Sequence, residues 1–166
     1  AIGARADERE HLARGIEEGL RLARFDALDR ALEIAGATGY GAAVLAACCK
    51  DVVALDPNPD LSFAAQAALE SAGVTNAKTV STPAIDGWAD EAPYDVILVN
   101  GSAEIVPDAW LKQLAPGGRL GVIVRHGAAG SARIYTRSAD ATAYRSAFDA
   151  APPVVPGLAK PQAFAF

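Results

Sequence analysis

Residues 30–56, RALEIAGATGYGAAVLAACCKDVVALD, contain the pattern that decides the fold of this chain. An apolar run at 30–37 ends in small residues, and a second apolar run occupies 51–56. Short apolar runs bounded by turn residues are typical of strands that are buried on both faces of a sheet. The segment between them, 41–50, contains no helix breaker after its first glycine. The stretch therefore predicts a strand, a glycine-rich turn, a helix and a second strand.

The same alternation continues along the chain. Stop signals for helices occur at Gly73 and in the APGG stretch at 115–118. Further strands are expected at 77–82, 94–100 and 119–127, and further helices at 61–73 and 108–114. Strands that alternate with helices in this way indicate an α/β fold, in which a doubly wound, mostly parallel sheet carries helices on both faces.

The two ends of the chain depart from this alternation. Residues 7–28 have an apolar residue about every fourth position with charges between them, so the sequence predicts an amphipathic helix there. Residues 132–139 and 143–148 alternate as antiparallel strands do, and the Pro-rich run at 152–166 is expected to end in a short strand. We therefore expect antiparallel strands at the C-terminal end of the sheet.

The composition limits the classes of function. The chain has 166 residues, of which 51% are hydrophobic, enough for one sizeable core. We expect a cytoplasmic protein without a membrane partner, because no apolar run could span a bilayer and nothing resembles a signal peptide. A net charge of −5 with scattered basic residues argues against nucleic acid as a partner. The oligomeric state is left open.

The cysteines and histidines offer no metal site. Cys48 and Cys49 are adjacent, and neighbouring cysteines rarely form a disulfide with each other, so both are expected to be buried thiols. No cluster of Cys and His has the spacing of metal ligands. His126 follows a predicted strand and is expected to be a solvated residue at its end, and His11 is expected on the surface of the charged helix.

The glycine-rich turn stands where doubly wound sheets bind their ligands. Gly36 and Gly39 allow the backbone to approach a ligand closely. Asp56 ends the second strand, where a carboxylate can accept hydrogen bonds from a ribose diol, and its spacing from Gly39 suits that role. The turn and Asp56 together predict an adenosine-containing ligand. Asp56 could instead cap the following helix ahead of Pro57.

A dinucleotide is one candidate ligand. The stretch IAGATGYG is superficially similar to the G-x-x-G-x-x-G turn of short-chain dehydrogenases, but Ala42 stands where that pattern has glycine. None of the four tyrosines is followed by lysine four residues later, so the Tyr-x-x-x-Lys pair of those enzymes is missing. A dinucleotide-binding oxidoreductase is therefore disfavoured.

Three stretches point to another family. ALEIAGATGYG, APYDVILVN and LAPGGRL, with their spacing, resemble the protein-L-isoaspartate O-methyltransferase family of class I S-adenosylmethionine-dependent methyltransferases. The resemblance runs from about Arg30 to Val124. It implies a Rossmann-like methyltransferase fold, S-adenosylmethionine as the cofactor, and a damaged protein or peptide with an isoaspartyl carboxylate as the substrate.

The same resemblance divides the chain and assigns residues. It implies one methyltransferase-like domain over 1–166, with an N-terminal helical segment at 1–29, a cofactor-binding core at 30–124 and C-terminal edge strands at 125–166. Glu33 would lie under the methionine end of the cofactor and help to hold its ammonium group, although it could instead cap the next helix. The residues assigned to the cofactor are Glu33, Ala35, Gly36, Gly39, Asp56 and Asn100.

Within that assignment, Asp56 would accept the ribose hydroxyls, and residues 100–103 would border the methyl-transfer pocket, although they could also be an ordinary turn. Methyl transfer to a carboxylate needs no general base, because the nucleophile is ionised near neutral pH. The absence of a Ser-His-Asp or Cys-His arrangement is thus compatible with this enzyme, and no catalytic residue is assigned.

Two departures from the family pattern affect the turn and the segment that precedes the first strand. Ala35 and Ala37 stand where the family has glycine. If either position needs a positive φ, alanine costs about 1–2 kcal/mol there. The family's hydroxyl-bearing segment before the first strand is missing from residues 1–30, which form a charged stretch instead.

A third departure affects the adenine edge. Pro83 and Ala84 occupy the positions of an Asp-Gly pair that holds the adenine in the family, and Ser81 and Asp86 are near enough in sequence to substitute. These losses leave a second hypothesis open: a degenerate relative that keeps the fold, binds the cofactor weakly or not at all, and serves as an interaction module.

Overall fold

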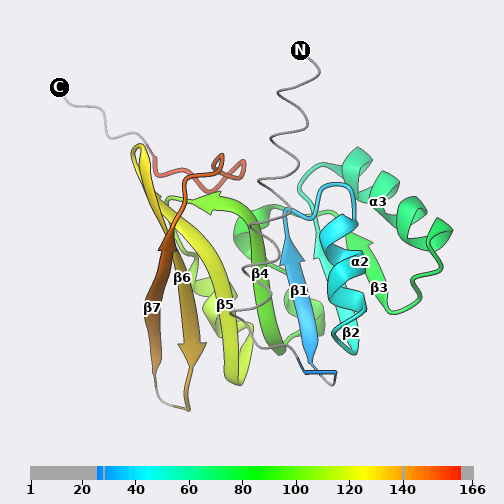
Figure 1. Ribbon diagram of the computed structural model, residues 1–166, viewed down its shortest axis with the longest axis horizontal. Coiled ribbons are helices and arrows are strands. Elements are labelled where there is room, and N and C mark those ends of the chain that lie inside the picture. Colours follow the sequence, from blue (N-terminus) through cyan, green and yellow to red (C-terminus); the bar gives the residue numbers. More distant parts are fainter. Residues whose placement is uncertain (1–25, 28, 140, 162–166) are drawn as a thin grey trace.

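The computed structural model describes residues 26–27, 29–139 and 141–161. In this part of the chain, seven strands form one sheet in the order β3-β2-β1-β4-β5-β6-β7 (Figure 1). Strands β1 to β5 are mutually parallel, whereas β6 and β7 are antiparallel to their neighbours. The expected α/β fold, a mostly parallel sheet with antiparallel strands at its C-terminal end, is confirmed.

The elements follow the sequence pattern in chain order. They are β1 (Arg30–Ile34), α2 (Tyr40–Ala46), β2 (Asp51–Leu55), α3 (Pro59–Ser71), β3 (Ala77–Val80), the 3-10 turns η1 (Ala84–Asp86) and η2 (Ala89–Glu91), β4 (Tyr94–Ala103), α4 (Asp108–Lys112), β5 (Leu114–His126), β6 (Ala129–Arg137) and β7 (Thr142–Asp149). The helix predicted over 7–28 falls almost wholly outside the described residues.

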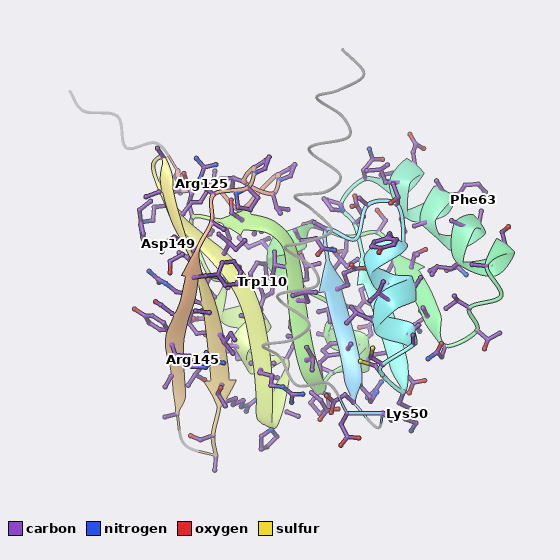
Figure 2. All side chains as sticks on the ribbon, in the orientation of Figure 1. Lys50, Phe63, Trp110, Arg125, Arg145 and Asp149 are labelled. Atoms are coloured by element: carbon purple, nitrogen blue, oxygen red, sulfur yellow. The ribbon has the colours of Figure 1, made fainter. Side chains whose placement is uncertain are left out.

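Strand β1 lies at the centre of the sheet and is covered on both faces. Leu32 and Ile34 pack on one face with Trp110 of α4, which is fully buried and labelled in Figure 2. Ala31 packs on the other face with Leu45 of α2. Burial on both faces explains why β1 is a continuous apolar run rather than an alternating one. Glu33 is the exception, a charged residue type with no exposed surface.

Helix α2 is shorter than predicted. It ends at Ala46 rather than continuing to residue 50, because the side-chain amide of Asn76 donates hydrogen bonds to the carbonyls of Ala46 and Cys49, at 2.9 and 3.1 Å. The chain turns there, which buries Cys49 and leaves Cys48 exposed. The prediction that both cysteines are buried is therefore wrong for Cys48.

Helix α4 and strand β5 also differ from the prediction. The helix ends at Lys112, and Leu114 already belongs to β5, where it pairs with Tyr94 of β4. The APGG stretch then interrupts the register before pairing resumes at Val96 and Arg119. Strand β5 begins five residues earlier than expected because this pairing with β4 is a long-range contact.

The segment 152–160, called the C-terminal strap below, crosses the carboxyl end of β4. The backbone of Ser102 accepts from Val155 N–H at 2.9 Å and donates to the Pro153 carbonyl at 3.0 Å. Val155 and Leu158 are buried in the core. Where a final strand was expected, the described residues form a single bridge between Ser102 and Val154, and 162–166 lie outside them. None of the helices described could cross a membrane.

Candidate cofactor site at the carboxyl ends of the strands

A tight turn at residues 35–39 connects β1 to α2 beside the centre of the sheet (Figure 1). Strand β1 lies between β2 and β4, so the strand order reverses beside it. From β1 the chain adds β2 and β3 on one side of the sheet and then β4 and β5 on the other. In open α/β sheets this switch point is where ligands bind, at the carboxyl ends of the strands. Glu33, Asp56 and Asn100 come from β1, the end of β2 and β4, and all three lie around this turn.

The backbone of the turn has the conformation that favours glycine. Ala35 has a φ of 63° and Ala37 a φ of 46°, and Gly39 follows with a φ of 80°. The N–H groups of Ala35 and Gly36 both donate to the Leu55 carbonyl, at 2.8 and 3.2 Å. The possibility that both alanines need a positive φ is confirmed, and each costs about 1–2 kcal/mol of stability. Hydrogen bonds to β2 hold the turn in spite of this strain.

Replacing Ala37 or Ala35 with glycine should therefore stabilise the protein, by about 1 kcal/mol each. The relief of strain at positive φ exceeds the extra chain entropy that glycine has in the unfolded state. Urea unfolding of each variant against the wild type measures the change. Ala67→Gly, at an exposed position inside α3, is the matched control and should destabilise by about 1 kcal/mol. Destabilisation by all three changes would contradict the strain assigned to the turn.

Glu33 lies beneath the turn and is completely buried. Its Oε1 accepts a hydrogen bond from the Asn100 side-chain amide, whereas its Oε2 has no hydrogen-bond partner among the described residues. A Cβ on Gly36 would lie 2.7 Å from Oε2, and one on Gly41 only 1.8 Å from Oε1. Only glycine fits over this carboxyl at both positions. Gly41 is not among the site residues predicted from the sequence, although a glycine in the first turn of a helix is a signal of close packing.

The environment of Glu33 disfavours its ionised form. Burial raises the pKa of Glu33 to about 8, the hydrogen bond from Asn100 and the backbone N–H of Ala42 oppose the shift, and the charge of Asp56 adds to it. The Ala42 N–H belongs to the first turn of α2, where helix N-termini favour an anion. A cation placed beside the turn would favour ionisation of Glu33.

Asp56 ties the turn to the end of β2. Its Oδ2 accepts from the Ala37 N–H at 3.0 Å and its Oδ1 from the Asn58 N–H at 2.9 Å, and the residue is 7% exposed. Asn58, not Asp56, is the N-cap of α3, because its side chain accepts from the Asp60 N–H. The alternative that Asp56 caps this helix is therefore wrong. Each carboxylate oxygen keeps acceptor capacity for a ligand.

Pro57, the residue after Asp56, lines a cavity of about 390 Å³. The other residues that line it are 81–85 and two residues of the C-terminal strap, Pro156 and Gly157. Of the two residues near the lost Asp-Gly pair, Ser81 lines this cavity and Asp86 does not. Two residues from the far end of the chain thus line the cavity beside Pro57, a contact that the sequence pattern did not predict.

The side chains of residues 100–103 do not all face the turn. Asn100 faces Glu33, but Ser102 is buried and its hydroxyl donates to the Pro152 carbonyl at 2.8 Å. Arg125, at the end of β5 in Figure 2, donates to the same carbonyl at 3.1 Å. Ser102 and Arg125 therefore anchor the strap. His126, beyond Arg125, is exposed as predicted.

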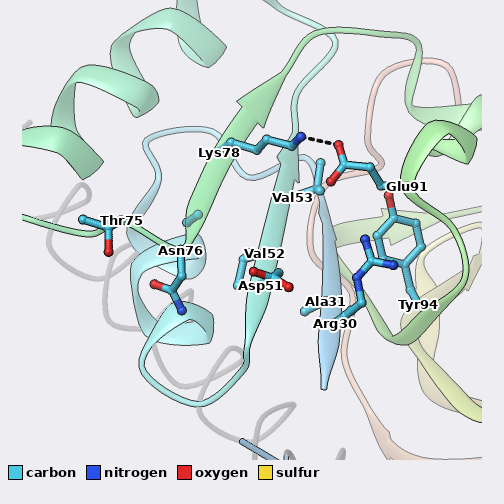
Figure 3. Close-up of a pocket in the computed structure, with 11 residues that line it drawn as sticks. Arg30, Ala31, Asp51, Val52, Val53, Thr75, Asn76, Lys78, Glu91 and Tyr94 are labelled. Carbon is cyan, nitrogen blue, oxygen red and sulfur yellow. Dashed lines mark ion pairs between the residues drawn. The ribbon is translucent and has the colours of Figure 1, made fainter. Parts of the chain in front are cut away.

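Another cavity, of about 320 Å³, lies at the opposite end of the strands (Figure 3). Arg30 and Asp51, the first residues of β1 and β2, line it together with the ion pair between Lys78 and Glu91. Because ligands of such sheets bind at the carboxyl ends, this cavity is separate from the site at the turn.

Comparison with known proteins places the chain in a family. The sequence model of the family described as Protein-L-isoaspartate(D-aspartate) O-methyltransferase matches residues 13–150. Protein-L-isoaspartate O-methyltransferase 1 of Syntrophobacter fumaroxidans is 41% identical over 96 residues, which are 58% of this chain and 45% of that protein. Protein-L-isoaspartate O-methyltransferase 1 of Nitrosospira multiformis is 44% identical over 92 residues, 55% of this chain and 39% of that protein.

Solved structures agree with this assignment. A protein-L-isoaspartate O-methyltransferase superposes with a TM-score of 0.81 at 25% identity, covering 87% of this chain and 47% of that one. An S-adenosylmethionine-dependent methyltransferase from Thiobacillus denitrificans, in complex with S-adenosyl-L-homocysteine, shares the fold with a TM-score of 0.55 at 20% identity, over 69% of this chain and 47% of that one. The chain spans about half the length of the curated relatives it matches. It belongs to the protein-L-isoaspartate O-methyltransferase family.

Proposed function

We propose that this chain binds S-adenosylmethionine at the turn between β1 and α2 and directs its methyl group to the carboxylate of an isoaspartyl residue in a damaged protein or peptide. One observation carries the proposal: two buried carboxyl groups lie beside one glycine-type turn, Glu33 beneath it and Asp56 bonded to the Ala37 N–H at its middle. Family membership supports the same activity. Residues 1–166 would form a single methyltransferase-like domain.

The residues present fit this cofactor. Oε2 of Glu33 is a buried oxygen with no hydrogen-bond partner in the described part of the chain, and a cationic ammonium nearby would compensate its charge. Because Glu33 has no exposed surface, it would act through its charge and through Asn100. Asp56 would accept the two ribose hydroxyls with its two oxygens, which already accept from the Ala37 and Asn58 N–H groups. The backbone at Ala35, Gly36 and Gly39 would lie against the cofactor.

When bound, the cofactor supplies a methyl group on a positively charged sulfur. This chain would contribute position and a dry environment rather than a general base, since the carboxylate that is methylated is already ionised near neutral pH. Asp56 and the turn would fix the nucleoside, and Asn100 would fix the orientation of Glu33. The strap would exclude water from the side of β4, because Ser102 and Arg125 hold it across the ends of the strands.

Calorimetric titration with S-adenosyl-L-homocysteine tests the binding step. We expect a dissociation constant of about 10 μM or tighter, at the tight end of the range of about 1 μM to 1 mM over which KM values of enzymes fall. NADPH is the control for the disfavoured hypothesis of a dinucleotide ligand, and its titration should give no heat of binding. Absence of heat at millimolar S-adenosyl-L-homocysteine would overturn the proposal in favour of a degenerate interaction module.

A methylation assay tests the catalytic step. The isoaspartyl form of a peptide should accept a labelled methyl group, while the same peptide with an ordinary aspartyl residue should not. Binding of S-adenosyl-L-homocysteine without turnover of the isoaspartyl peptide would contradict the proposed substrate while leaving the proposed cofactor intact.

A further inference from the structure

Asn100 lies on a β-bulge of strand β4. The pairing of β4 with β5 breaks between Leu98 and Ser102, whose partners on β5 are two residues apart. Three residues of β4, 99–101, therefore lie opposite a single residue of β5. Bulges of this kind re-aim a side chain, often next to an active site. This one directs Asn100 to the buried carboxyl of Glu33, to which its side-chain amide donates a hydrogen bond.

The C-terminal strap fastens the end of this bulge at Ser102, a fully buried residue. The Ser102 hydroxyl donates to the Pro152 carbonyl at 2.8 Å. Its N–H donates to the Pro153 carbonyl at 3.0 Å, and its carbonyl accepts from the Val155 N–H at 2.9 Å. The strap thus holds the side chain of Ser102 and both of its backbone hydrogen-bonding groups.

Gly101 brings the strap into direct contact with the bulge. Its φ of 131° is a conformation that favours glycine. A Cβ at this position would lie 2.8 Å from Cγ2 of Val155 and 3.3 Å from the Pro153 carbonyl oxygen. Val155 is 4% exposed and packs in the core, so it cannot shift without loss of contacts. The strap therefore packs on the backbone next to Asn100, and the shape of the bulge depends on the strap.

Resting on the proposed function, we infer that Ser102 is a positioning residue for the cofactor site, because it clamps the bulge to the strap and so holds Asn100 against Glu33. Ser102 is fully buried, so it acts through Asn100 rather than by contact with the cofactor. The carboxyl that would face the ammonium group of S-adenosylmethionine is thereby oriented from the far end of the chain.

A double-mutant cycle tests whether Ser102 acts through Asn100. Ser102→Ala should weaken the binding of S-adenosyl-L-homocysteine, measured by calorimetry, by about threefold or more, the effect of one lost hydrogen bond. Asn100→Ala should weaken binding at least as much. In the Asn100→Ala background, Ser102→Ala should have no further effect, because the residue through which it acts is gone. Unchanged affinity in Ser102→Ala, or an equal loss in both backgrounds, would overturn the inference.

Ser138→Ala is the matched control for the loss of a serine hydroxyl. The Ser138 hydroxyl also donates to a backbone carbonyl, that of Ala141 at 3.0 Å, but in the exposed connection between β6 and β7. This variant should keep the wild-type affinity. A loss as large as that of Ser102→Ala would show that the effect is not specific to the bulge and would overturn the inference.

The ligand-free protein gives a readout that a merely structural role of Ser102 would not move. Burial raises the pKa of Glu33 to about 8 and the charge of Asp56 adds to this, whereas the hydrogen bond from Asn100 lowers the pKa. If Ser102→Ala displaces Asn100, the folded pKa rises, and the stability measured by urea denaturation should continue to fall beyond pH 8. Asn100→Ala should shift the profile in the same direction.

The stability profile and the titration separate the inference from the proposed function. A profile in Ser102→Ala that levels at the wild-type pH would overturn the inference while leaving the proposed function intact. Absence of binding of S-adenosyl-L-homocysteine by the wild type would instead overturn the proposed function, and with it the role of Ser102 in cofactor binding.

Discussion

Replacing Glu33 with glutamine is expected to remove a pH dependence of about 1.4 kcal/mol per pH unit from the stability of the protein. In the wild type, the free energy of unfolding should fall at that rate as the pH rises between about 5.5 and 7.5, a loss of about 3 kcal/mol. The glutamine variant, which cannot ionise at this position, should show a nearly flat profile over the same range.

The expected slope follows from the two pKa values of Glu33. Burial raises its pKa from 4.5 to about 8 in the folded chain. Between these values the folded protein keeps the proton and the unfolded chain has released it, so stability falls as the pH rises. Below pH 4.5 both states are protonated and the effect is absent. Above the folded value both are ionised, and the full cost of about 5 kcal/mol is present.

Urea denaturation at several pH values measures the effect in both proteins. Glutamine retains the carbonyl that accepts from Asn100 and nearly the shape of glutamate, so the packing of Gly36 and Gly41 is preserved. Glu70→Gln, at an exposed position of α3, is the matched control and should follow the wild-type profile. Parallel profiles for the wild type and Glu33→Gln would show that the carboxyl is ionised in the folded state well below pH 8.

The same group should make ligand binding depend on pH. If an ammonium group binds beside ionised Glu33, the affinity for S-adenosyl-L-homocysteine should rise with pH by up to about tenfold per unit below pH 8. Calorimetry in buffers of different ionisation enthalpy would then detect a proton released on binding. Glu33→Gln should bind more weakly at pH 8 and release no proton.

Replacing Asp56 with alanine should have the second large effect, a loss of about a hundredfold or more in affinity for S-adenosyl-L-homocysteine. A carboxylate that accepts two ribose hydroxyls contributes about 1.5–3 kcal/mol through each charge-assisted bond. The change also removes the acceptor of the Ala37 and Asn58 N–H groups, so stability should fall by about 3 kcal/mol.

Asn58→Ala separates these two effects. Asn58 caps α3 through its side chain, and its loss should cost about 1 kcal/mol of stability while leaving Asp56 and its bond to Ala37 in place. Urea denaturation and calorimetry on both variants compare the two residues. Wild-type affinity in Asp56→Ala would place the ribose elsewhere, and a hundredfold loss in Asn58→Ala would attribute the effect to general loosening.

Local features of the fold were predictable from contiguous residues. The alternation of apolar strands and helices predicted the parallel sheet. Ala35 and Ala37 stand where the family has glycine, which suggested positive φ angles in the turn, and both residues have them. The end of α2 was not predictable, because it depends on Asn76, which is 30 residues beyond Ala46. The start of β5 depends in the same way on pairing with Tyr94.

The sequence by itself determined the fold class, the position of the turn, and the placement of Glu33 and Asp56 at the ends of adjacent strands, because periodicity and turn conformation belong to neighbouring residues. Only the tertiary structure decided that Glu33 is buried with one oxygen unpaired among the described residues, that Ser81 rather than Asp86 lines the cavity beside Pro57, and that the strap crosses β4. These features arise from contacts across the chain, as between Glu33 and Asn100, 67 residues apart, and burial and hydrogen bonding are set by such contacts rather than by local pattern.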